Sequence, residues 1–588
     1  MFDPTKMKDW EIAEAAEANL RPVGDLAREL GLLDSEIVRY GEYLCKVDAA
    51  AVERRLAGTK NAAKYIDVTA ITPTPLGEGK TTTTLGLVEG LGKIGKRVIG
   101  TIRQPSGGPT FNVKGSAAGG GLAQVAPLSA LSLGLTGDID AITNANNLAM
   151  VALNSRMQHE CCHDDEWLAS RNIFRRLNID PDRVQLKWAI DFCAQGLRNI
   201  RMGLGGELDG YEMDSGFYIT VASEVMAILS MSSDLEDLRR RLGRMVVAYS
   251  KDGAPVTTAD LEVDGAMCAW LVNAIKPTLM QSLEGQPMLV HAGPFANIAI
   301  GQSSVIADRL ASLLADYVVT ESGFASDIGY EKFWNIKCRC SGLKPSAVVL
   351  VTTVRALKAH GGAPAVKAGM PLASAYTHEN LPLLKKGCEN MLAHIDIVKK
   401  SGIRPVVCLN AFHTDTAAEM ELVRDVATAA GARFAVSDHW MRGGEGAIDL
   451  AAQVVMACDE ANDFHYLSPL TETLTERIYR IATEVYGGEG VDFSDEALRK
   501  LSQYEKTPEV ASLPICMAKT QYSLSHDPTL LGRPKGWRLP VRDIMVYFGA
   551  GIVVPITGSI KLMPGSVANA AYRRIDVDTR TGKVKGLF

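Results

Sequence analysis

The chain has 588 residues, enough for about three or four domains or subdomains, and 47% of them are hydrophobic. This balance is typical of a globular enzyme with a large buried core. The net charge of −6 gives no overall positive field, so we expect no nucleic acid as a partner. The acidic N-terminal stretch has no apolar run, so we expect neither a signal peptide nor a membrane partner.

Eleven cysteines are scattered from Cys45 to Cys516 without the spacing of a disulfide framework. Their number is odd, and reduced thiols are typical of cytosolic proteins, so we predict a cytoplasmic location. The longest uncharged apolar run, Met545–Ile560, is short and rich in glycine. We expect a buried pair of strands there rather than a transmembrane helix.

Residues 8–56 show helical spacing and predict an N-terminal helical cap, with one helix over the stretch LDSEIVRYGEYL (33–44). A β-rich run over 65–71 follows. After it come a turn with several glycines, a helix over 81–95 and a second buried strand over 97–102. Strand, turn, helix and strand together predict a βαβ unit.

Five later apolar runs have the length of buried strands, and helical stretches separate most of them. They cover residues 288–292, 317–320, 347–353, 405–409 and 434–436. This alternation predicts an α/β protein with a mostly parallel sheet that carries the nucleotide site, together with additional α/β domains. Ligands of such sheets bind in the loops after the carboxyl ends of the strands.

Composition changes along the chain predict three parts. Residues 1–139 and 251–365 are expected to form the nucleotide-binding domain with its helical cap. Residues 140–250 look mostly helical and are expected to be an inserted subdomain. A segment rich in glycine, proline and alanine near residue 366 suggests a linker into a C-terminal α/β domain, 366–588.

The turn of the βαβ unit, Thr74–Thr82, has the composition of a phosphate-binding loop and is called the phosphate loop below. Its glycines let backbone N–H groups approach a phosphate, and the helix start adds positive partial charge. Lys80 is expected to reach the β- and γ-phosphates of ATP, and Thr81 to ligate Mg²⁺. The usual first glycine is replaced by Thr74, but the strand and helix around the loop argue against a turn that binds nothing. The predicted nucleotide contacts are Thr74, Pro75, Leu76, Gly77, Glu78, Gly79, Lys80, Thr81 and Thr82.

Arg103 opens the segment RQPSGGP where the second strand ends, facing the same crevice as Lys80. A guanidinium there can hold a phosphoryl oxygen or a carboxylate through two hydrogen bonds, although a surface arginine is the alternative. Downstream, the glycine-rich segment 114–121 begins with Lys114. It either lines the nucleotide or carries a tight crossing of two chain segments.

Two aromatic residues lie on loops that follow strands late in the chain, Phe412 and Trp440. Both loops are expected to open on one edge of the sheet, where two rings can enclose a flat ligand. From the residues alone, burial of both rings in the core is the competing interpretation.

Two clusters of polar residues allow more than one functional interpretation. His159–His163 holds histidines, a glutamate and two cysteines, but its spacing does not match a standard zinc site, so a helix end or loop is favoured over a metal. Asp327 lies in a loop after a predicted strand, where it either supports Mg²⁺ or the nucleotide or belongs to a solvated loop.

Taken together, these blocks resemble the formate–tetrahydrofolate ligase (formyltetrahydrofolate synthetase) family along nearly the whole chain. The blocks that carry the resemblance are TPTPLGEGKTTTTLGL, RQPSGGP, KGSAAGGGLAQV, TVASEVMAI, HAGPFANIA, DYVVTESGFASDIGYEKF, VRALKAHGG, LNAFHTDTAAE, WMRGGEGAIDLA, CMAKTQYSLSHDP and FGAGIVVPITGSI. Any one block is modest, but their order along the chain is highly specific.

The resemblance implies a reaction in which formate, ATP and tetrahydrofolate give 10-formyltetrahydrofolate, ADP and phosphate through formyl phosphate. It implies that Lys80 and Arg103 are catalytic and that Thr81 lies beside Mg²⁺. It also implies that Phe412 and Trp440 enclose the folate, which reverses the preference for a core role, and that a glycine loop, Gly443 to Gly446, lies beside them, with Gly443 and Gly444 in contact with substrate. A homotetramer is implied as well.

The chain departs from the family pattern at several positions. The family has glutamate after the arginine, where this chain has Gln104. That glutamate is tied to a monovalent cation, K⁺ or NH₄⁺, so Gln104 counts against the cation activation that the family implies. Asp140 and Ile300 each stand where the family has histidine. An alternative is therefore a divergent homologue that binds nucleotide or folate with altered or lost turnover.

Overall fold

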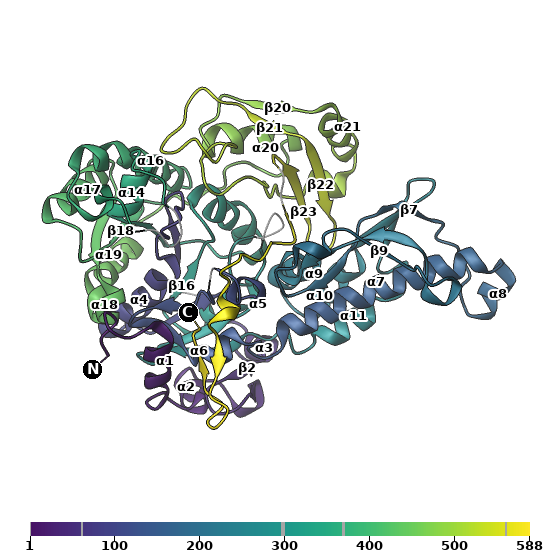
Figure 1. Ribbon diagram of the computed structural model, residues 1–588, viewed down its shortest axis with the longest axis horizontal. Coiled ribbons are helices and arrows are strands. Elements are labelled where there is room, and N and C mark those ends of the chain that lie inside the picture. Colours follow the sequence, from purple (N-terminus) through teal and green to yellow (C-terminus); the bar gives the residue numbers. More distant parts are fainter. Residues whose placement is uncertain are drawn as a thin grey trace.

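A computed structural model gives the structure of the protein and describes residues 2–59, 63–113, 115–295, 300–366, 371–558 and 561–587. Within these ranges, twelve strands form one sheet, with the main order β1-β2-β14-β15-β4-β16-β3-β17-β18-β19 (Figure 1). The strands from β15 to β19 in this order are all parallel. They are β15 (Pro287–Val290), β4 (Val98–Ile102), β16 (Tyr317–Glu321), β3 (Lys64–Ala70), β17 (Ala347–Thr352), β18 (Val406–Asn410) and β19 (Arg433–Ser437). The predicted parallel α/β sheet and its strands are confirmed.

The sheet is buried on both faces because successive side chains of each strand point to opposite sides. In β17, Val349 and Val351 join one apolar cluster, which also contains side chains of α4 (Lys80–Lys93) and α19 (Ile448–Asp459). Leu350 joins another cluster, with side chains of α16 (Leu381–Lys399) and α17 (Ala417–Ala429). Continuous apolar strands are therefore what a sheet covered on both faces requires.

The N-terminal segment is only partly helical. Helices α1 (Asp9–Glu17), α2 (Val23–Glu29) and α3 (Ala49–Arg55) are present. The helix predicted over 33–44 is wrong, because β1 (Ile37–Arg39) pairs with β2 (Cys45–Val47) there. Ile37 and Val38 favour a strand, Gly41 provides a positive-φ turn, and β2 gains a second partner in β14 (Thr278–Ser282) at the sheet edge.

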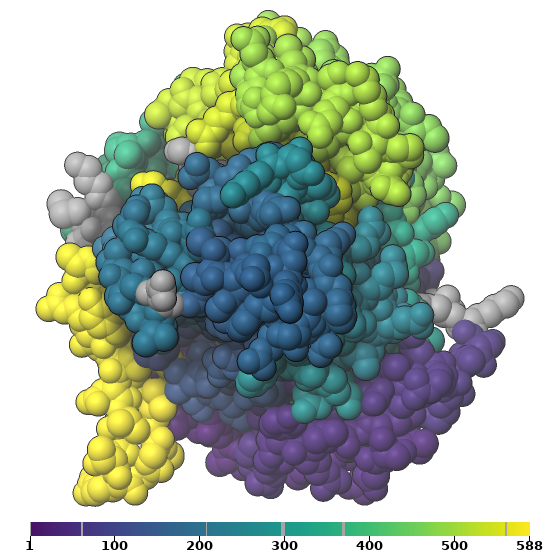
Figure 2. Space-filling view, turned by 90° about the vertical axis from the view of Figure 1, so that its right-hand side faces the viewer, coloured from purple at the N-terminus to yellow at the C-terminus, as the bar shows by residue number. Residues whose placement is uncertain are grey.

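Residues 138–271 form an arm on one side of the molecule, seen at the right of Figure 1 and end-on in Figure 2. The long helix α7 (Asp138–Cys162) packs against α11 (Asp264–Leu271) along it. The expectation of a mostly helical segment is wrong for residues 179–219, where short strands alternate with turns. These strands are β7 (Ile179–Val184), β8 (Trp188–Ile190), β9 (Ile200–Met202), β10 (Met213–Ser215) and β11 (Phe217–Ile219). Four of them have only three residues, too few to show a period, and the six residues of β7, IDPDRV, include a proline and three charged side chains.

The C-terminal part adds strands to the sheet and then builds a separate layer. Strands β18 and β19 continue the central sheet across the predicted boundary at residue 366, while the division into domains stays a prediction. The predicted strand pair is confirmed: β22 (Asp543–Tyr547) and β23 (Ile552–Ile556) are antiparallel, although residues 559–560 of that run lie outside the described ranges. In the described parts of the chain, none of the helices combines the length and apolar character that crossing a bilayer requires.

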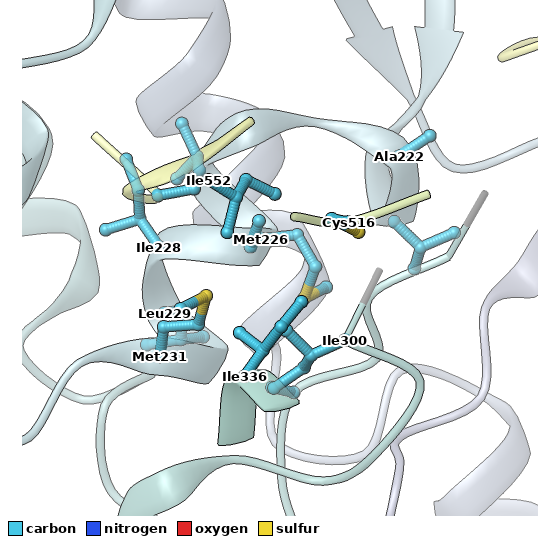
Figure 3. Close-up of a cluster of buried hydrophobic side chains, with 14 of the residues drawn as sticks. Ala222, Met226, Ile228, Leu229, Met231, Ile300, Ile336, Cys516 and Ile552 are labelled. Carbon is cyan, nitrogen blue, oxygen red and sulfur yellow. The ribbon is translucent and has the colours of Figure 1, made fainter. Parts of the chain in front are cut away.

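An apolar cluster joins the arm, the sheet region and the C-terminal layer (Figure 3). Met226 and Ile228 come from α9 (Glu224–Met231) and Ile552 from β23, while Ile300 lies beside Ile336 at the base of the cluster. Ile300 is fully buried there. Ile300, which stands where the family pattern has histidine, is therefore a core residue in this chain.

Candidate active site

The phosphate loop joins the end of β3 to the start of α4, as predicted. Gly77 and Gly79 adopt positive φ angles of 73° and 75°, which glycine accepts without strain. A β-carbon on Gly79 would also lie only 2.5 Å from Nδ2 of Asn410. Asn410 donates to the carbonyl oxygen of Glu78 (3.2 Å), so the end of β18 braces the loop. This role of Asn410 was not predicted, because its partner lies in a distant segment of the chain.

Thr74 occupies the position of the usual first glycine. It closes the loop by hydrogen bonding to Glu78, four positions further along the chain. Its backbone N–H (2.7 Å) and hydroxyl (3.1 Å) both donate to the Glu78 carboxylate. Glu78 is buried, and burial raises the pKa of its carboxyl. The loop is therefore held by its own side chains as well as by its backbone.

Two cations and two carboxylates meet at the carboxyl edge of the sheet. Burial, and to a lesser degree Arg103, lower the pKa of Lys80, while Glu78 and Glu321 act in the opposite direction. The ammonium group of Lys80 forms no hydrogen bond or ion pair with the residues that the structure describes, although the backbone carbonyl of Lys80 accepts one from the Thr84 hydroxyl (3.0 Å). Its ammonium group is therefore available to a ligand at this edge.

Glu321 ends β16, which lies between β3 and β4, and its carboxylate therefore stands between the phosphate loop and Arg103. The Thr81 hydroxyl donates to Oε2 of Glu321 (2.7 Å), and Nη2 of Arg103 lies 3.8 Å from Oε1. Sequence reasoning passed over Glu321. The available signal was an acid at the last position of a buried parallel strand, where ligands bind.

The segment after Arg103 is fixed by a carboxylate from the arm. Asp191 accepts hydrogen bonds from the Ser106 hydroxyl and from the backbone N–H of Gly107, both at 2.6 Å. Burial raises the pKa of Asp191 to about 6. Beside Arg103, a cavity of about 450 Å³ opens against the C-terminal layer, and Lys332, Lys519 and His526 are among its lining residues.

Phe412 and Trp440 follow β18 and β19, at the same edge of the sheet as the phosphate loop. The guanidinium of Arg355 lies 4.3 Å from the centre of the Phe412 ring. The Trp440 side chain is 38% exposed, and among the described residues the two rings do not contact each other. The structure thus brings both rings to the predicted edge and leaves them outside the core, with Phe412 only partly buried.

The residues around Trp440 pack tightly on α4. His439 is buried, with Nδ1 2.7 Å from the Ser437 hydroxyl, and burial lowers its pKa to about 4. A β-carbon on Gly86 would overlap its ring. Gly443 and Gly444 are buried against Glu284, which accepts a hydrogen bond from the Gly444 N–H (3.0 Å). Close packing therefore explains why glycine occupies both positions, while contact of Gly443 and Gly444 with substrate stays a prediction.

Segment 114–121 was expected either to line the nucleotide or to carry a tight crossing of two chain segments. The structure shows such a crossing, with the segment at Trp440. A β-carbon on Gly121 would lie 2.1 Å from the carbonyl oxygen of Trp440, and Leu122 N–H donates to that oxygen (2.9 Å). Lys114 lies outside the described residues.

The two polar clusters, His159–His163 and the segment at Asp327, make contacts within the protein. Asp327 is fully buried and pairs with Lys519 (3.0 Å), so it does not belong to a solvated loop. His163 stacks on Trp167 with ring centres 3.6 Å apart. No group of three or more metal-ligating side chains is present among the residues with assigned positions.

Gln104 is buried, and neither its side-chain nitrogen nor its side-chain oxygen has a hydrogen-bond partner among the described residues.

A parallel sheet, a glycine loop before a helix, and a lysine and a threonine at the helix start define a phosphate-loop protein of the α/β class. Comparison with known proteins then identifies the group. The family model for formate–tetrahydrofolate ligase matches residues 7–588. The chain belongs to the formate–tetrahydrofolate ligase family.

Proteins named formate–tetrahydrofolate ligase are similar to this chain over its full length. One from Dehalococcoides mccartyi is 63% identical over 587 residues, covering 100% of this chain and 98% of that protein. Those from Desulforapulum autotrophicum and Lawsonia intracellularis are 57% and 58% identical, with 100% of both chains covered.

Proposed function

We propose that this chain catalyses the ATP-dependent ligation of formate to tetrahydrofolate, giving 10-formyltetrahydrofolate, ADP and phosphate. The observation that carries the proposal is the family match over residues 7–588 together with Lys80 and Arg103 at one edge of the sheet. Formate is a poor acyl donor because its leaving group would be oxide. Phosphorylation by ATP converts it into a mixed anhydride that an amine can attack.

The proposed reaction has two transfers. A formate oxygen attacks the γ-phosphorus of ATP, the bond to the bridging oxygen breaks, and ADP leaves. The N10 amine of tetrahydrofolate then attacks the formyl carbon, the bond from that carbon to the phosphate oxygen breaks, and phosphate leaves as the amine loses its proton. Negative charge gathers on the phosphoryl oxygens in both steps, so catalysis needs positioning and electrostatic stabilisation more than covalent chemistry by the protein.

The residues divide these tasks. Lys80 and the N–H groups of the phosphate loop, Thr74–Thr82, hold the phosphates of ATP, and Thr81 faces Mg²⁺. Mg²⁺, when bound, neutralises phosphate charge. Arg103 holds the phosphoryl group or carboxylate of the acyl phosphate, supported by Asp191 through the segment that follows it. Phe412 and Trp440 enclose the flat folate ring, with Gly443 and Gly444 beside them.

We further infer a cytoplasmic homotetramer. None of the eleven cysteines, all of which lie in the described ranges, forms a disulfide, which suits a reducing compartment. The family glutamate associated with K⁺ or NH₄⁺ is replaced by the neutral Gln104, so we propose weak dependence on a monovalent cation.

Arg103→Ala tests the assignment of the acyl-phosphate site. We expect kcat/KM for formate to fall on the order of 10²–10³-fold, because a positioned cation no longer meets the transferring group. The matched control is Arg97→Ala, at the opposite end of the same strand, which should stay close to wild type. Near-normal turnover of Arg103→Ala would overturn the assignment, and ATP and folate binding without turnover by the wild-type protein would favour the divergent homologue.

A further inference from the structure

The strongest unassigned feature is the carboxylate of Glu321. It is only 5% exposed and ends the strand between those that lead into the phosphate loop and Arg103. One oxygen accepts the Thr81 hydroxyl (2.7 Å), and the other lies 3.8 Å from Arg103. A buried acid at a phosphate-binding edge repels the ligand that the edge is built to hold, unless a cation lies between them.

The charges of the cluster support this point. Lys80 and Arg103 are matched by Glu78 and Glu321, so these four groups together supply no net positive charge to offset the phosphates of a nucleotide. A divalent cation restores the balance. It also explains why an acid occupies the end of β16, since a neutral side chain there would suit bare phosphate better.

The donor atoms fit Mg²⁺. Hydroxyl and carboxylate oxygens are its preferred ligands, and it commonly binds through one or two protein groups plus phosphate oxygens and water. Within the described residues, no cluster of three or more metal-ligating side chains offers an all-protein cage, so a metal here must share its coordination with the nucleotide. In other phosphate-loop enzymes, a loop threonine and an acid on a neighbouring strand have this task.

We propose that Glu321, together with Thr81, holds the Mg²⁺ of the bound nucleotide. The inference rests on the proposed function, because it requires ATP at the phosphate loop. Its consequence reaches Arg103: a carboxylate that turns to the metal no longer attracts the guanidinium, which becomes free for the acyl phosphate. Glu321 thereby links nucleotide loading to the site of formate activation.

The test measures binding and not turnover. The affinity of a non-hydrolysable ATP analogue is determined by calorimetry in Mg²⁺ and in EDTA, for wild type and Glu321→Gln. We expect the gain in affinity from Mg²⁺ to shrink about 10- to 100-fold in the variant, while the affinity in EDTA stays equal or rises. Mn²⁺ replaces Mg²⁺ in a parallel titration, in which loss of the free Mn²⁺ EPR signal reports the metal directly.

Controls separate a metal role from a structural one. Asp316→Asn removes a carboxylate just before the other end of β16 and should keep the full Mg²⁺ effect. Thr81→Val should lose the Mg²⁺ effect and Thr81→Ser should keep it, which tests the site even if Glu321→Gln does not fold. An undiminished Mg²⁺ effect in folded Glu321→Gln overturns the inference. If wild-type protein binds no nucleotide in either buffer, the proposed function fails and the inference fails with it.

Discussion

The two halves of the site are built differently, although both lie at the same edge of one sheet. The phosphate half, at the ends of β3, β4 and β16, is held by short, partly buried hydrogen bonds such as Thr81–Glu321 and Thr74–Glu78. The aromatic half, after β18 and β19, presents rings that are partly exposed and not in mutual contact. The charged groups are thus preorganised before a ligand binds, whereas the two rings would enclose a flat ligand only when it is bound.

This contrast predicts that changes in the phosphate half reduce turnover, and that changes in the aromatic half mainly reduce affinity. The largest effect is expected for Lys80→Ala, because its unpaired ammonium group meets charge that develops on the phosphoryl group. We expect kcat to fall on the order of 10³-fold or more, measured as ADP release coupled to 10-formyltetrahydrofolate. Lys93→Ala, at the far end of the same helix, is the control, and equal activities of the two variants would contradict the account.

The next effect tests how tightly the phosphate loop is held. Gly79→Ala adds a β-carbon 2.5 Å from Asn410 and also forces alanine into a positive φ, which costs about 1–2 kcal/mol. Gly95→Ala has the same φ problem but open space around it. Both variants should lose similar thermal stability, whereas only Gly79→Ala should lower kcat/KM for ATP, by about 10- to 100-fold. Equal ATP kinetics in the two variants would show that Asn410 does not brace the loop.

The aromatic half is probed by Trp440→Ala. Loss of one stacking surface is expected to weaken tetrahydrofolate binding roughly tenfold, with kcat changed much less. Trp270→Ala removes a ring that is 50% exposed on the arm and should leave folate binding unchanged. A large fall in kcat without a change in folate affinity would place Trp440 with the phosphate half instead.

The last prediction concerns a buried acid behind the site, whose titration affects stability and not catalysis. Asp67 accepts a hydrogen bond from Ser322, next to Glu321, and burial raises the pKa of Asp67 to about 8. The folded protein therefore holds the Asp67 proton more tightly than the unfolded chain does. This contribution to the free energy of unfolding is fully present below about pH 4 and is lost as pH rises through about 8. Its slope is at most about 1.4 kcal/mol per pH unit. Urea midpoints of wild type should fall across this range relative to those of Asp67→Asn. Parallel curves would contradict the raised pKa.

Much of this arrangement could be predicted from the sequence, because parallel strands are continuous apolar runs and the phosphate loop has a local composition with a direct physical meaning. What escaped prediction depended on contacts between distant segments. Asn410 and Glu78 are 332 positions apart, and Thr81 and Glu321 are 240 apart, so no local period records them. The strand at Ile37–Arg39 pairs with the nearby Cys45–Val47, but that second strand is held at the sheet edge by the distant strand β14, which the local sequence does not record.

We expect ATP, formate and tetrahydrofolate to be consumed in one coupled reaction. The most direct test measures ADP and 10-formyltetrahydrofolate from purified protein with Mg²⁺, omitting each substrate in turn and comparing K⁺ with Na⁺. The account predicts that both products appear together only when all three substrates are present, with similar rates in the two salts. ADP release that requires neither formate nor folate, or nucleotide and folate binding with no turnover, would contradict this expectation.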